Sequence, residues 1–260
     1  MKKPALSSKA ARAVEDAYVV FATYSPGAQL ATCRCPECMD DETEQRLLTT
    51  PPRDIDWELL SEYTWSANGT NDPKYNADEL RYFLPRYFEL IAAGEHPCFG
   101  NPEPALRQLG RIAFRTSWPT NEIKAIDDFF SALLAHNLSQ PIAWYETRTG
   151  ETIASSDVLA DLCLMAIGGC DLTQLLALWE RDLRIEASAH LAASVQFQSW
   201  AFWVDIDGPR NLLTSWLFSE ATADRLHRAA LVEGATPLGN LFRSSSELAL
   251  TEPSAREHPS

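Results

Sequence analysis

The sequence predicts an all-α protein, built as a multi-helical bundle or as a short HEAT-like α-solenoid of helical hairpins. Three observations predict this class. Apolar residues recur at helical spacing in most segments of the 260-residue chain. Short turns such as Gly168-Gly169 separate these segments, and short turns between helices produce antiparallel neighbours. Alternating patterns typical of strands are rare, and we find no fixed sequence period of a true repeat array.

The segment from Glu79 to Ala93 has the clearest helical pattern, and we expect the rest of the chain to pack around it. Pro85 lies outside its apolar stripe, so we expect this residue on the outer face, where it bends the helix. The stripe itself consists of Leu80, Phe83, Leu84, Tyr87, Phe88 and Ile91.

Two helices are predicted before this segment. Ser8 to Tyr24 forms an amphipathic pattern, and a short strand from Tyr18 to Thr23 is the alternative because that stretch contains β-branched residues. Asp54 is the predicted N-cap of a helix from Asp56 to Ala67, which ends at the turn residues from Asn68 onward. The predicted packing residues of that helix are Leu59, Leu60, Tyr63 and Trp65.

The remaining helices are predicted at short intervals. Ser219 and Gly234 frame one of them as N-cap and stop signal, and Leu183 is expected to face inward at the end of another. Residues 140–152, which include Trp144, predict a loop or short hairpin. The predicted helices are Glu103–Phe114, Asn121–His136, Asp157–Ile167, Leu172–Leu183, Ala187–Val204, Asn211–Phe218, Ala221–Val232 and Pro237–Leu250.

Composition favours one domain. Hydrophobic residues make up 45% of the chain, and eight Trp with eleven Phe bring large areas to bury in a single core. We therefore predict one helical domain over residues 1–250, with a sub-boundary near 140–152. The tail over 251–260 has too little apolar surface to bury and is predicted to be disordered.

The charge of the chain excludes one class of partner and sets an expectation for location. A net charge of −14 and a pI near 4.8 argue against nucleic-acid binding, which needs clustered Lys and Arg. The chain has neither 18 consecutive apolar residues nor the apolar core of a signal peptide, so we expect no membrane association and a cytoplasmic location.

Negative charge is concentrated in the first third of the chain. Between Glu37 and Glu79 there are twelve Asp or Glu and three Lys or Arg, a net charge of −9. This segment is a candidate surface for a basic protein partner, and a solvated helix surface is the alternative interpretation. The candidate partner-binding residues are Glu37, Asp40, Asp41, Glu42 and Glu44.

The cysteines of this segment are the most distinctive chemical feature. Cys35 and Cys38 form a C-P-x-C turn, which can present two thiolates to one metal ion, and Cys33 is a candidate third ligand. The expected metal is zinc. A structural turn with reduced thiols and a redox centre are the alternatives, and the nearby acidic residues disfavour the redox role because they oppose thiolate formation.

Zinc usually takes four protein ligands at structural sites and three at catalytic ones. No second C-x-x-C motif exists in the chain, so spacing alone does not identify the fourth ligand. The candidates are His96, Cys98, His136, Cys163 and Cys170. His190 lies in a predicted buried helix with no partner at metal-ligand spacing, so we expect it to be a hydrogen-bonded core residue.

Three short motifs occur in a recognisable order: Cys35-Pro36-Glu37-Cys38, Leu48-Thr49-Thr50-Pro51 and Leu80-Arg81-Tyr82-Phe83-Leu84-Pro85-Arg86. Together they resemble a group of uncharacterised bacterial proteins with a C-P-x-C turn followed by an R-[YH]-F-L-P-R helix. The similarity covers about a quarter of the chain, roughly Cys33 to Ala93, and implies no particular activity. The additional Cys33 departs from the pattern of that group.

No catalytic motif with a known mechanism is present: the chain lacks P-loop, dinucleotide-binding, zinc-protease and G-x-S-x-G patterns. We assign no catalytic residue and expect a non-enzymatic protein-binding module, such as an immunity or adaptor protein for a basic partner. The alternative is a zinc-binding or redox protein, or an enzyme, that uses Cys33, Cys35 and Cys38. A homodimer that buries exposed aromatic residues is a third hypothesis.

Overall fold

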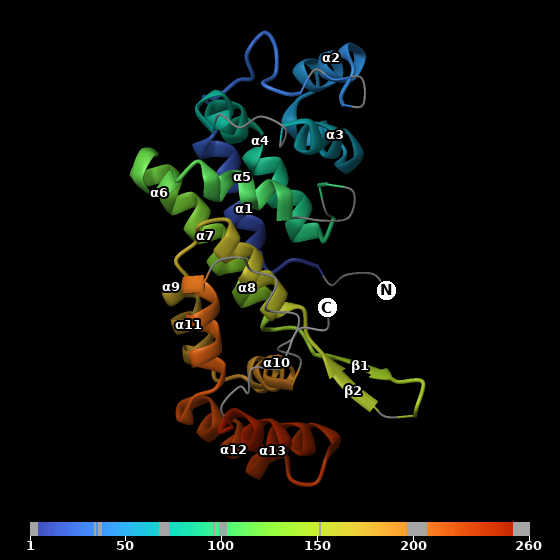
Figure 1. Cartoon of the computed structure of the whole chain (residues 1–260), viewed down its shortest axis with the longest axis vertical. Helices are drawn as coiled ribbons and strands as arrows, with labels where there is room; N and C mark the ends of the chain where they lie inside the picture. The colour runs from blue at the N-terminus through green and yellow to red at the C-terminus, as the bar shows by residue number, and fades with distance from the viewer. Residues whose placement is uncertain are drawn as a thin grey trace. The chain divides into compact units, whose positions relative to one another are not determined.

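The computed structural model confirms the all-α prediction (Figure 1). It describes residues 5–33, 35, 38–67, 73–95, 97–98, 103–150, 152–196 and 207–251. The elements are α1 (Ser8–Val20), α2 (Asp41–Thr49), the 3₁₀ helix η1 (Pro52–Asp54), α3 (Trp57–Ala67), α4 (Pro73–Ala93), α5 (Glu103–Arg111), α6 (Phe114–Ser117), α7 (Thr120–Asn137), β1 (Ala143–Glu146), β2 (Thr152–Ser155), α8 (Val158–Ile167), α9 (Leu172–Arg181), α10 (Ile185–Gln196), α11 (Asp207–Leu217), α12 (Glu220–Glu233) and α13 (Pro237–Ala249).

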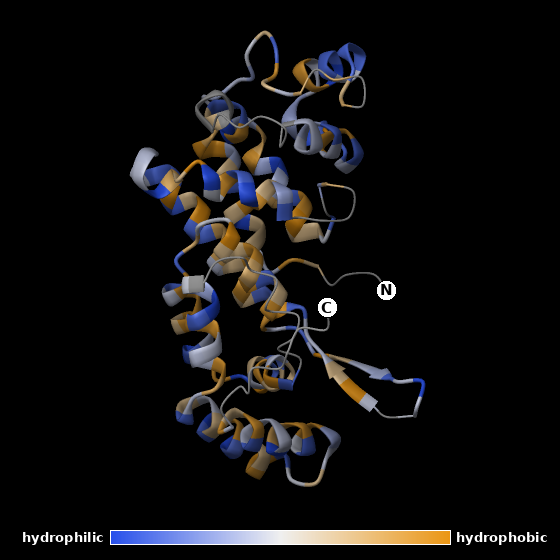
Figure 2. Ribbon diagram, viewed as in Figure 1, coloured by the Kyte–Doolittle hydropathy of each residue, from blue (hydrophilic) through white to orange (hydrophobic). Residues whose placement is uncertain are grey.

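The chain divides into two compact units. Unit 1 comprises Met1–His136 and Leu164–Asp171, and unit 2 comprises Asn137–Cys163 and Leu172–Ser260. Helix α8 contributes residues to both. The described helices carry apolar and polar residues side by side along their length, as expected when each buries one face (Figure 2). None of the described helices combines the length and the apolar composition that spanning a bilayer requires.

Helix α4 supplies the central apolar stripe of unit 1. Five of its six predicted stripe residues are buried, and Ile91 is half-buried. Phe88 stacks on Phe129 of α7 with a distance of 4.0 Å between ring centroids, which joins the two helices. The helix begins at Pro73, six residues before the predicted start. Pro85 is buried, so its predicted position on the outer face is wrong.

Helix α1 confirms the amphipathic prediction and excludes the strand alternative. The hydroxyl of Ser7 accepts a hydrogen bond from the backbone nitrogen of Ala10 at 3.2 Å and caps the helix. The helix ends at Val20, four residues before the predicted end. Its buried side is made largely of small residues, which allow a close approach: Ala10, Ala13, Val14 and Ala17.

Two predictions about helix α3 are wrong. Its cap is Asp56, whose Oδ1 accepts from the backbone nitrogen of Leu59 at 2.7 Å, whereas Asp54 belongs to η1. Tyr63 is fully buried, as predicted, but Trp65 is 57% exposed. The helical pattern placed Trp65 with the packing residues because it considered only this helix and not its neighbours.

One helix was predicted from Glu103 to Phe114, but a residue with non-helical backbone conformation separates α5 from α6. Ala113 adopts a left-handed conformation with φ of 51°, which a continuous α-helix cannot contain. Gly110 of α5 approaches the chain closely, since a Cβ atom there would lie 2.1 Å from the carbonyl oxygen of Ile167. Only glycine therefore fits this contact within unit 1.

Unit 2 begins with the predicted hairpin. Strands β1 and β2 pair antiparallel, with Trp144 opposite Ala154 and Tyr145 opposite Ile153. Both aromatic residues are exposed.

Helix α10 carries the predicted buried segment as far as Gln196, and its continuation to Val204 lies outside the described residues. Leu183, between α9 and α10, is 84% exposed, which contradicts its predicted inward position. The helix α9 ends at Arg181, so Leu183 does not share its packed face.

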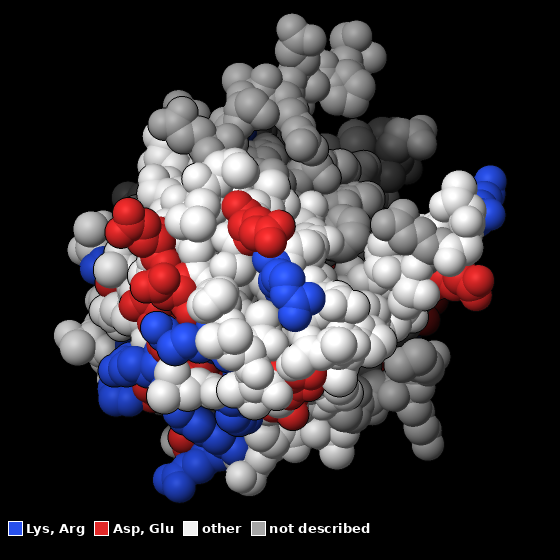
Figure 3. All heavy atoms as spheres, turned by 90° about the horizontal axis from the view of Figure 1, so that it is seen from below, with Lys and Arg blue, Asp and Glu red and all other residues white. Residues whose placement is uncertain are grey.

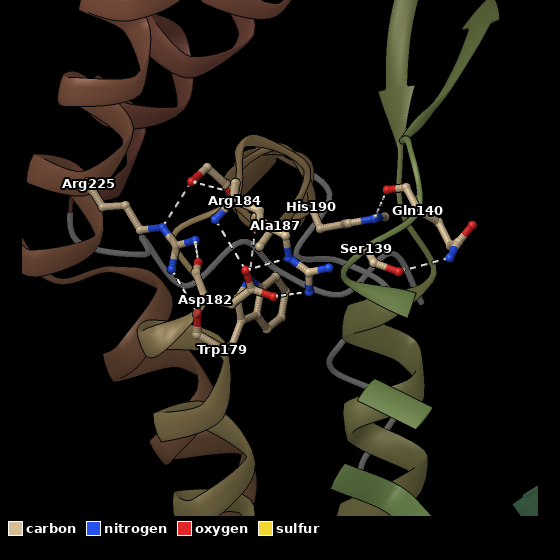
Figure 4. Close-up of polar contacts among 9 residues, drawn as sticks. Ser139, Gln140, Trp179, Asp182, Arg184, Ala187, His190 and Arg225 are labelled. Carbon is tan, nitrogen blue, oxygen red and sulfur yellow. Dashed lines mark hydrogen bonds and ion pairs between the residues drawn. The ribbon is translucent and has the colours of Figure 1, made fainter. Parts of the chain in front are cut away.

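Arg225 of α12 joins three elements of unit 2. Its guanidinium donates to the carbonyl oxygen of Trp179 at 2.9 Å, to that of Asp182, and to the hydroxyl of Ser188 at 3.1 Å (Figure 4). Trp179 lies in the last turn of α9 and Asp182 directly follows the helix, where carbonyls lack intrahelical donors. Arg225 therefore satisfies the end of α9 while packing α12 against α10.

The last two helices match their predictions within one or two residues. Ser219 caps α12 through the backbone nitrogen of Thr222, and Gly234 ends it with a φ of 64°. Thr236 caps α13 through Gly239. Figure 3, viewed from the end where Figure 1 draws these helices, shows basic and acidic side chains next to one another. This face is therefore not uniformly acidic.

Candidate metal centre

Cys33, Cys35 and Cys38 form one thiol cluster in the segment between α1 and α2. Their Sγ atoms all lie within 4.8 Å of one another, and those of Cys35 and Cys38 are 3.2 Å apart. The backbone nitrogen of Cys38 donates to the carbonyl oxygen of Cys35 at 3.1 Å, which closes the turn. Cys35 is exposed, and the other two are half-buried. The three residues therefore converge at the surface of unit 1.

Ser66, near the end of α3, holds both sides of the thiol cluster. Its carbonyl oxygen accepts from the backbone nitrogen of Cys33 at 3.0 Å. Its hydroxyl accepts from the backbone nitrogen of Met39, also at 3.0 Å. Ser66 is fully buried. A rigid helix thus positions the two ends of the loop that carries the thiols, as a metal site requires of its supporting residues.

Two buried carboxylates hold the chain that leads into the thiol cluster. Glu44 of α2 accepts from the backbone nitrogen of Leu30 at 2.6 Å, and Glu79 of α4 accepts from that of Ala31 at 2.8 Å. Glu79 also accepts from the hydroxyl of Tyr63 at 3.2 Å. Backbone donors that would otherwise be buried without partners are therefore satisfied by charged acceptors, which form strong hydrogen bonds.

The electrostatics of the thiols disfavour a free reactive thiolate. Hydrogen bonding with Cys35 and Cys33 raises the pKa of Cys38 to about 12. Reactive and redox cysteines generally have a lowered pKa instead. A bound cation reverses this preference because it stabilises the thiolate directly. Three thiols at this spacing are thus better suited to a metal ion than to nucleophilic chemistry.

The spacing of the sulfurs fits a soft metal ion. Zinc–sulfur bonds of about 2.3 Å in tetrahedral geometry place sulfurs about 3.8 Å apart. This value lies between the Cys35–Cys38 sulfur separation of 3.2 Å and the limit of 4.8 Å within which all three sulfurs lie. Among the described residues, this group of three is the only set of Cys, His, Asp or Glu side chains able to hold a metal.

Four of the five predicted candidates for a fourth ligand are described by the structure, and none of these four joins the thiol cluster. His136 of α7 accepts a hydrogen bond from the backbone nitrogen of Ser7 at 3.3 Å. Cys98 and Cys163 are buried, and burial raises the pKa of both thiols, that of Cys163 to about 12. Burial likewise raises the pKa of Cys170. His96 lies outside the described residues.

The acidic residues near the thiol cluster differ in burial and in hydrogen bonding. Asp40 caps α2, because its Oδ1 accepts from the backbone nitrogen of Thr43 at 2.7 Å, and this bond lowers its pKa. Asp41 and Glu42 are exposed in the first turn, where carboxylates interact favourably with the helix dipole. Glu44 is buried, and Glu37 lies outside the described residues.

Ser66 and Glu79 were not identified from the sequence as parts of this site. Both occur within helical patterns and act on the thiol segment only after folding. Comparisons of the chain with protein-family models, with curated proteins and with solved structures find no match. The functional proposal therefore rests on the thiol cluster and the residues that hold it.

Proposed function

We propose that the protein is a zinc-binding protein that uses Cys33, Cys35 and Cys38 as thiolate ligands. The observation that supports this function is the convergence of three Sγ atoms within 4.8 Å on a turn held from both sides by Ser66. Thiolates select soft or borderline ions, among which zinc is suited to a site without redox chemistry.

The thiol cluster is well placed to stabilise unit 1. It links the segment after α1 to α3 through Ser66, and the carboxylates of Glu44 and Glu79 extend this connection to α2 and α4. A metal that binds only the folded arrangement adds its binding free energy to folding. Zinc in this protein would therefore hold a segment without helical structure against three helices.

We expect purified protein to contain one zinc ion per chain, and Cys35→Ser to weaken binding at least about hundredfold because it removes a direct ligand. Elemental analysis and competition with a chromogenic chelator measure both quantities. Chelation of zinc should also lower the unfolding free energy of the wild type, by about 2.7 kcal/mol relative to a zinc concentration of 100 times Kd.

Cys170→Ser is the matched control, because it removes a half-buried thiol outside the cluster and should keep the metal. Protein without stoichiometric metal, together with equal stability before and after chelation, would contradict the zinc site. Selective formation of a Cys35–Cys38 disulfide under mild peroxide, without metal, would support the redox alternative instead.

A second function rests on a different observation. Asp40, Asp41 and Glu42 are three consecutive exposed carboxylates at the start of α2, next to the thiol cluster. They lie within the segment that carries a net charge of −9. We propose that this surface binds a basic protein partner, since complementary charge promotes encounter and fixes orientation.

A further inference from the structure

His190 of α10 connects the two ends of the β1–β2 hairpin. Its Nε2 lies 2.9 Å from the carbonyl oxygen of Gln140, before β1, and its Nδ1 lies 2.7 Å from Oγ of Ser156, after β2. Figure 4 shows the imidazole ring and its contact with Gln140. A carbonyl oxygen can only accept, so Nε2 carries the proton, and the Ser156 hydroxyl donates to the lone pair of Nδ1.

This arrangement has the three parts of an activated nucleophile: a hydroxyl, a base that accepts its proton, and a third group that orients the base. His190 is only 5% exposed, whereas Ser156 is half-buried. Burial lowers the pKa of His190, which keeps the imidazole neutral and able to accept a proton near pH 7. The base is thus more deeply buried than the nucleophile.

Ser219 shows what a serine at a helix start does without such a base. Ser219 is also half-buried. Its Oγ accepts a hydrogen bond from the backbone nitrogen of Thr222 at 3.2 Å, and its hydroxyl donates one to the carbonyl oxygen of Trp216. Ser156 makes a similar contact with the backbone nitrogen of Val158 at 3.3 Å. Supporting a helix start therefore needs no imidazole, and His190 gives Ser156 a base that Ser219 lacks.

We propose that Ser156 is an acyl-accepting nucleophile with His190 as its general base. Ser156 Oγ attacks the carbonyl carbon of an ester while its proton moves to Nδ1 of His190. The ester C–O bond then breaks, and the proton passes from His190 to the departing alcohol, which leaves an acyl-serine. Water repeats the sequence through the same base and releases the carboxylic acid, so ester and water give acid and alcohol.

The surrounding charges define the substrate class. Against the effect of burial, hydrogen bonds with the backbone of Gln140 and Asn137 raise the pKa of His190 most. The carboxylates of Asp157, at the start of α8, and of Glu186, one turn before His190 on α10, raise it further. The same negative charges repel an anionic acyl donor. The site therefore accepts uncharged or cationic esters, and small aryl esters are suitable probes.

The test uses full-length protein with p-nitrophenyl acetate and a fluorophosphonate probe, followed by mapping of the modified serine by mass spectrometry. We expect labelling at Ser156 to be at least about a hundredfold faster than at Ser219, since a positioned base contributes about 10²–10⁴ in rate. Ser156→Ala should abolish this labelling, and Ser219→Ala should leave it unchanged. Equal labelling of the two serines would overturn the proposal.

His190→Gln should slow labelling of Ser156 about hundredfold if its far-UV circular dichroism matches that of the wild type. If this variant unfolds, the pH profile of the wild type decides. A neutral imidazole base gives a labelling rate that is constant from about pH 7 to about pH 9. A rate that rises tenfold per pH unit over this range would show a serine activated only by hydroxide, and would also overturn the proposal.

Discussion

Arg81 of α4 holds together several aromatic and acidic residues of unit 1. Its Nε donates to Oε2 of Glu122 at 2.9 Å, and the two side chains are only 11% and 5% exposed. The guanidinium also lies 4.1 Å from the centre of the Trp118 ring, and the Tyr24 hydroxyl donates to Glu122. Stacking and several hydrogen bonds are what allow a buried ion pair to offset its desolvation cost.

Replacement of Arg81 by Met should lower the unfolding free energy by about 3 kcal/mol, because Glu122 stays buried without a cation. The unfolding free energy of Arg81→Lys should lie between those of the wild type and Arg81→Met, since lysine keeps the charge but loses the planar stacking. Urea unfolding at pH 7 measures both. The double variant Arg81→Met, Glu122→Leu is the control and should recover more than half of the loss. A single Met variant as stable as the wild type would show that the pair contributes nothing.

At the scale of elements, the β1–β2 hairpin depends on α10. A two-stranded hairpin is marginally stable on its own, and Trp144 and Tyr145 are exposed, so the strands bury little area. The hydrogen bonds of His190 to Gln140 and Ser156 fix both ends of the hairpin to the helix. This attachment requires a lone pair on Nδ1 if the Ser156 hydroxyl is to donate, so it is sensitive to protonation.

Acid should therefore destabilise unit 2 through His190. Burial lowers the pKa of His190 in the folded protein below the ordinary value of 6.5, so folding favours the neutral imidazole. The stabilisation is fully present above about pH 6.5 and is lost as the pH falls toward the lowered pKa. Urea midpoints between about pH 7.5 and about pH 5.5 should decrease in the wild type more steeply than in His190→Gln.

His227→Gln, at an exposed position of α12, is the matched control and should keep the pH dependence of the wild type. Equal slopes for the wild type and His190→Gln would contradict the effect. Hydrogen exchange of the amides of β1 and β2 at the lower pH locates the loss, since opening of the hairpin exposes those amides before the helices unfold.

The elements that the sequence predicted well are those whose pattern is local. Helix α12 has its own N-cap at Ser219 and its own stop at Gly234, so its bounds could be predicted without neighbours. The exposure of Trp65 and the burial of Pro85 depend on which other helices pack there, and a single-helix pattern contains no information on this. The same limit explains the error at Leu183.

The candidate metal centre also has a part that local sequence predicts and a part that depends on tertiary packing. Its three thiols lie within six positions of the chain, so their convergence could be predicted from spacing. The groups that hold them are distant: Glu79 lies 48 residues from its partner Ala31. The pairing of Ser156 with His190 spans 34 residues and follows no known motif. Contacts of this kind arise from tertiary packing and leave no local signal.

On the scale of the whole molecule, we expect the attraction of a basic partner to depend more on where the charges lie than on the net charge. The net charge is −14, and −9 of it belongs to the segment from Glu37 to Glu79. Helices α12 and α13 instead carry both signs in their sequence. Figure 3 likewise shows acidic and basic side chains on one face of the molecule. Long-range attraction of a basic protein should therefore act mainly through the region of α2, and its strength should fall with salt.

Two variants of equal net charge test this dependence on position. Asp41→Asn with Glu42→Gln removes two exposed carboxylates from α2, and Glu220→Gln with Asp224→Asn removes two from α12. The first should weaken capture of a basic partner roughly fivefold, equivalent to about 1 kcal/mol, in pull-downs from the native cell at low salt. The α12 variant should capture the basic partner nearly as well as the wild type. About 300 mM salt should abolish capture by the wild type and by both variants. Equal weakening by both pairs would mean that only total charge matters, and recovery of no basic partner by the wild type would contradict the binding function itself.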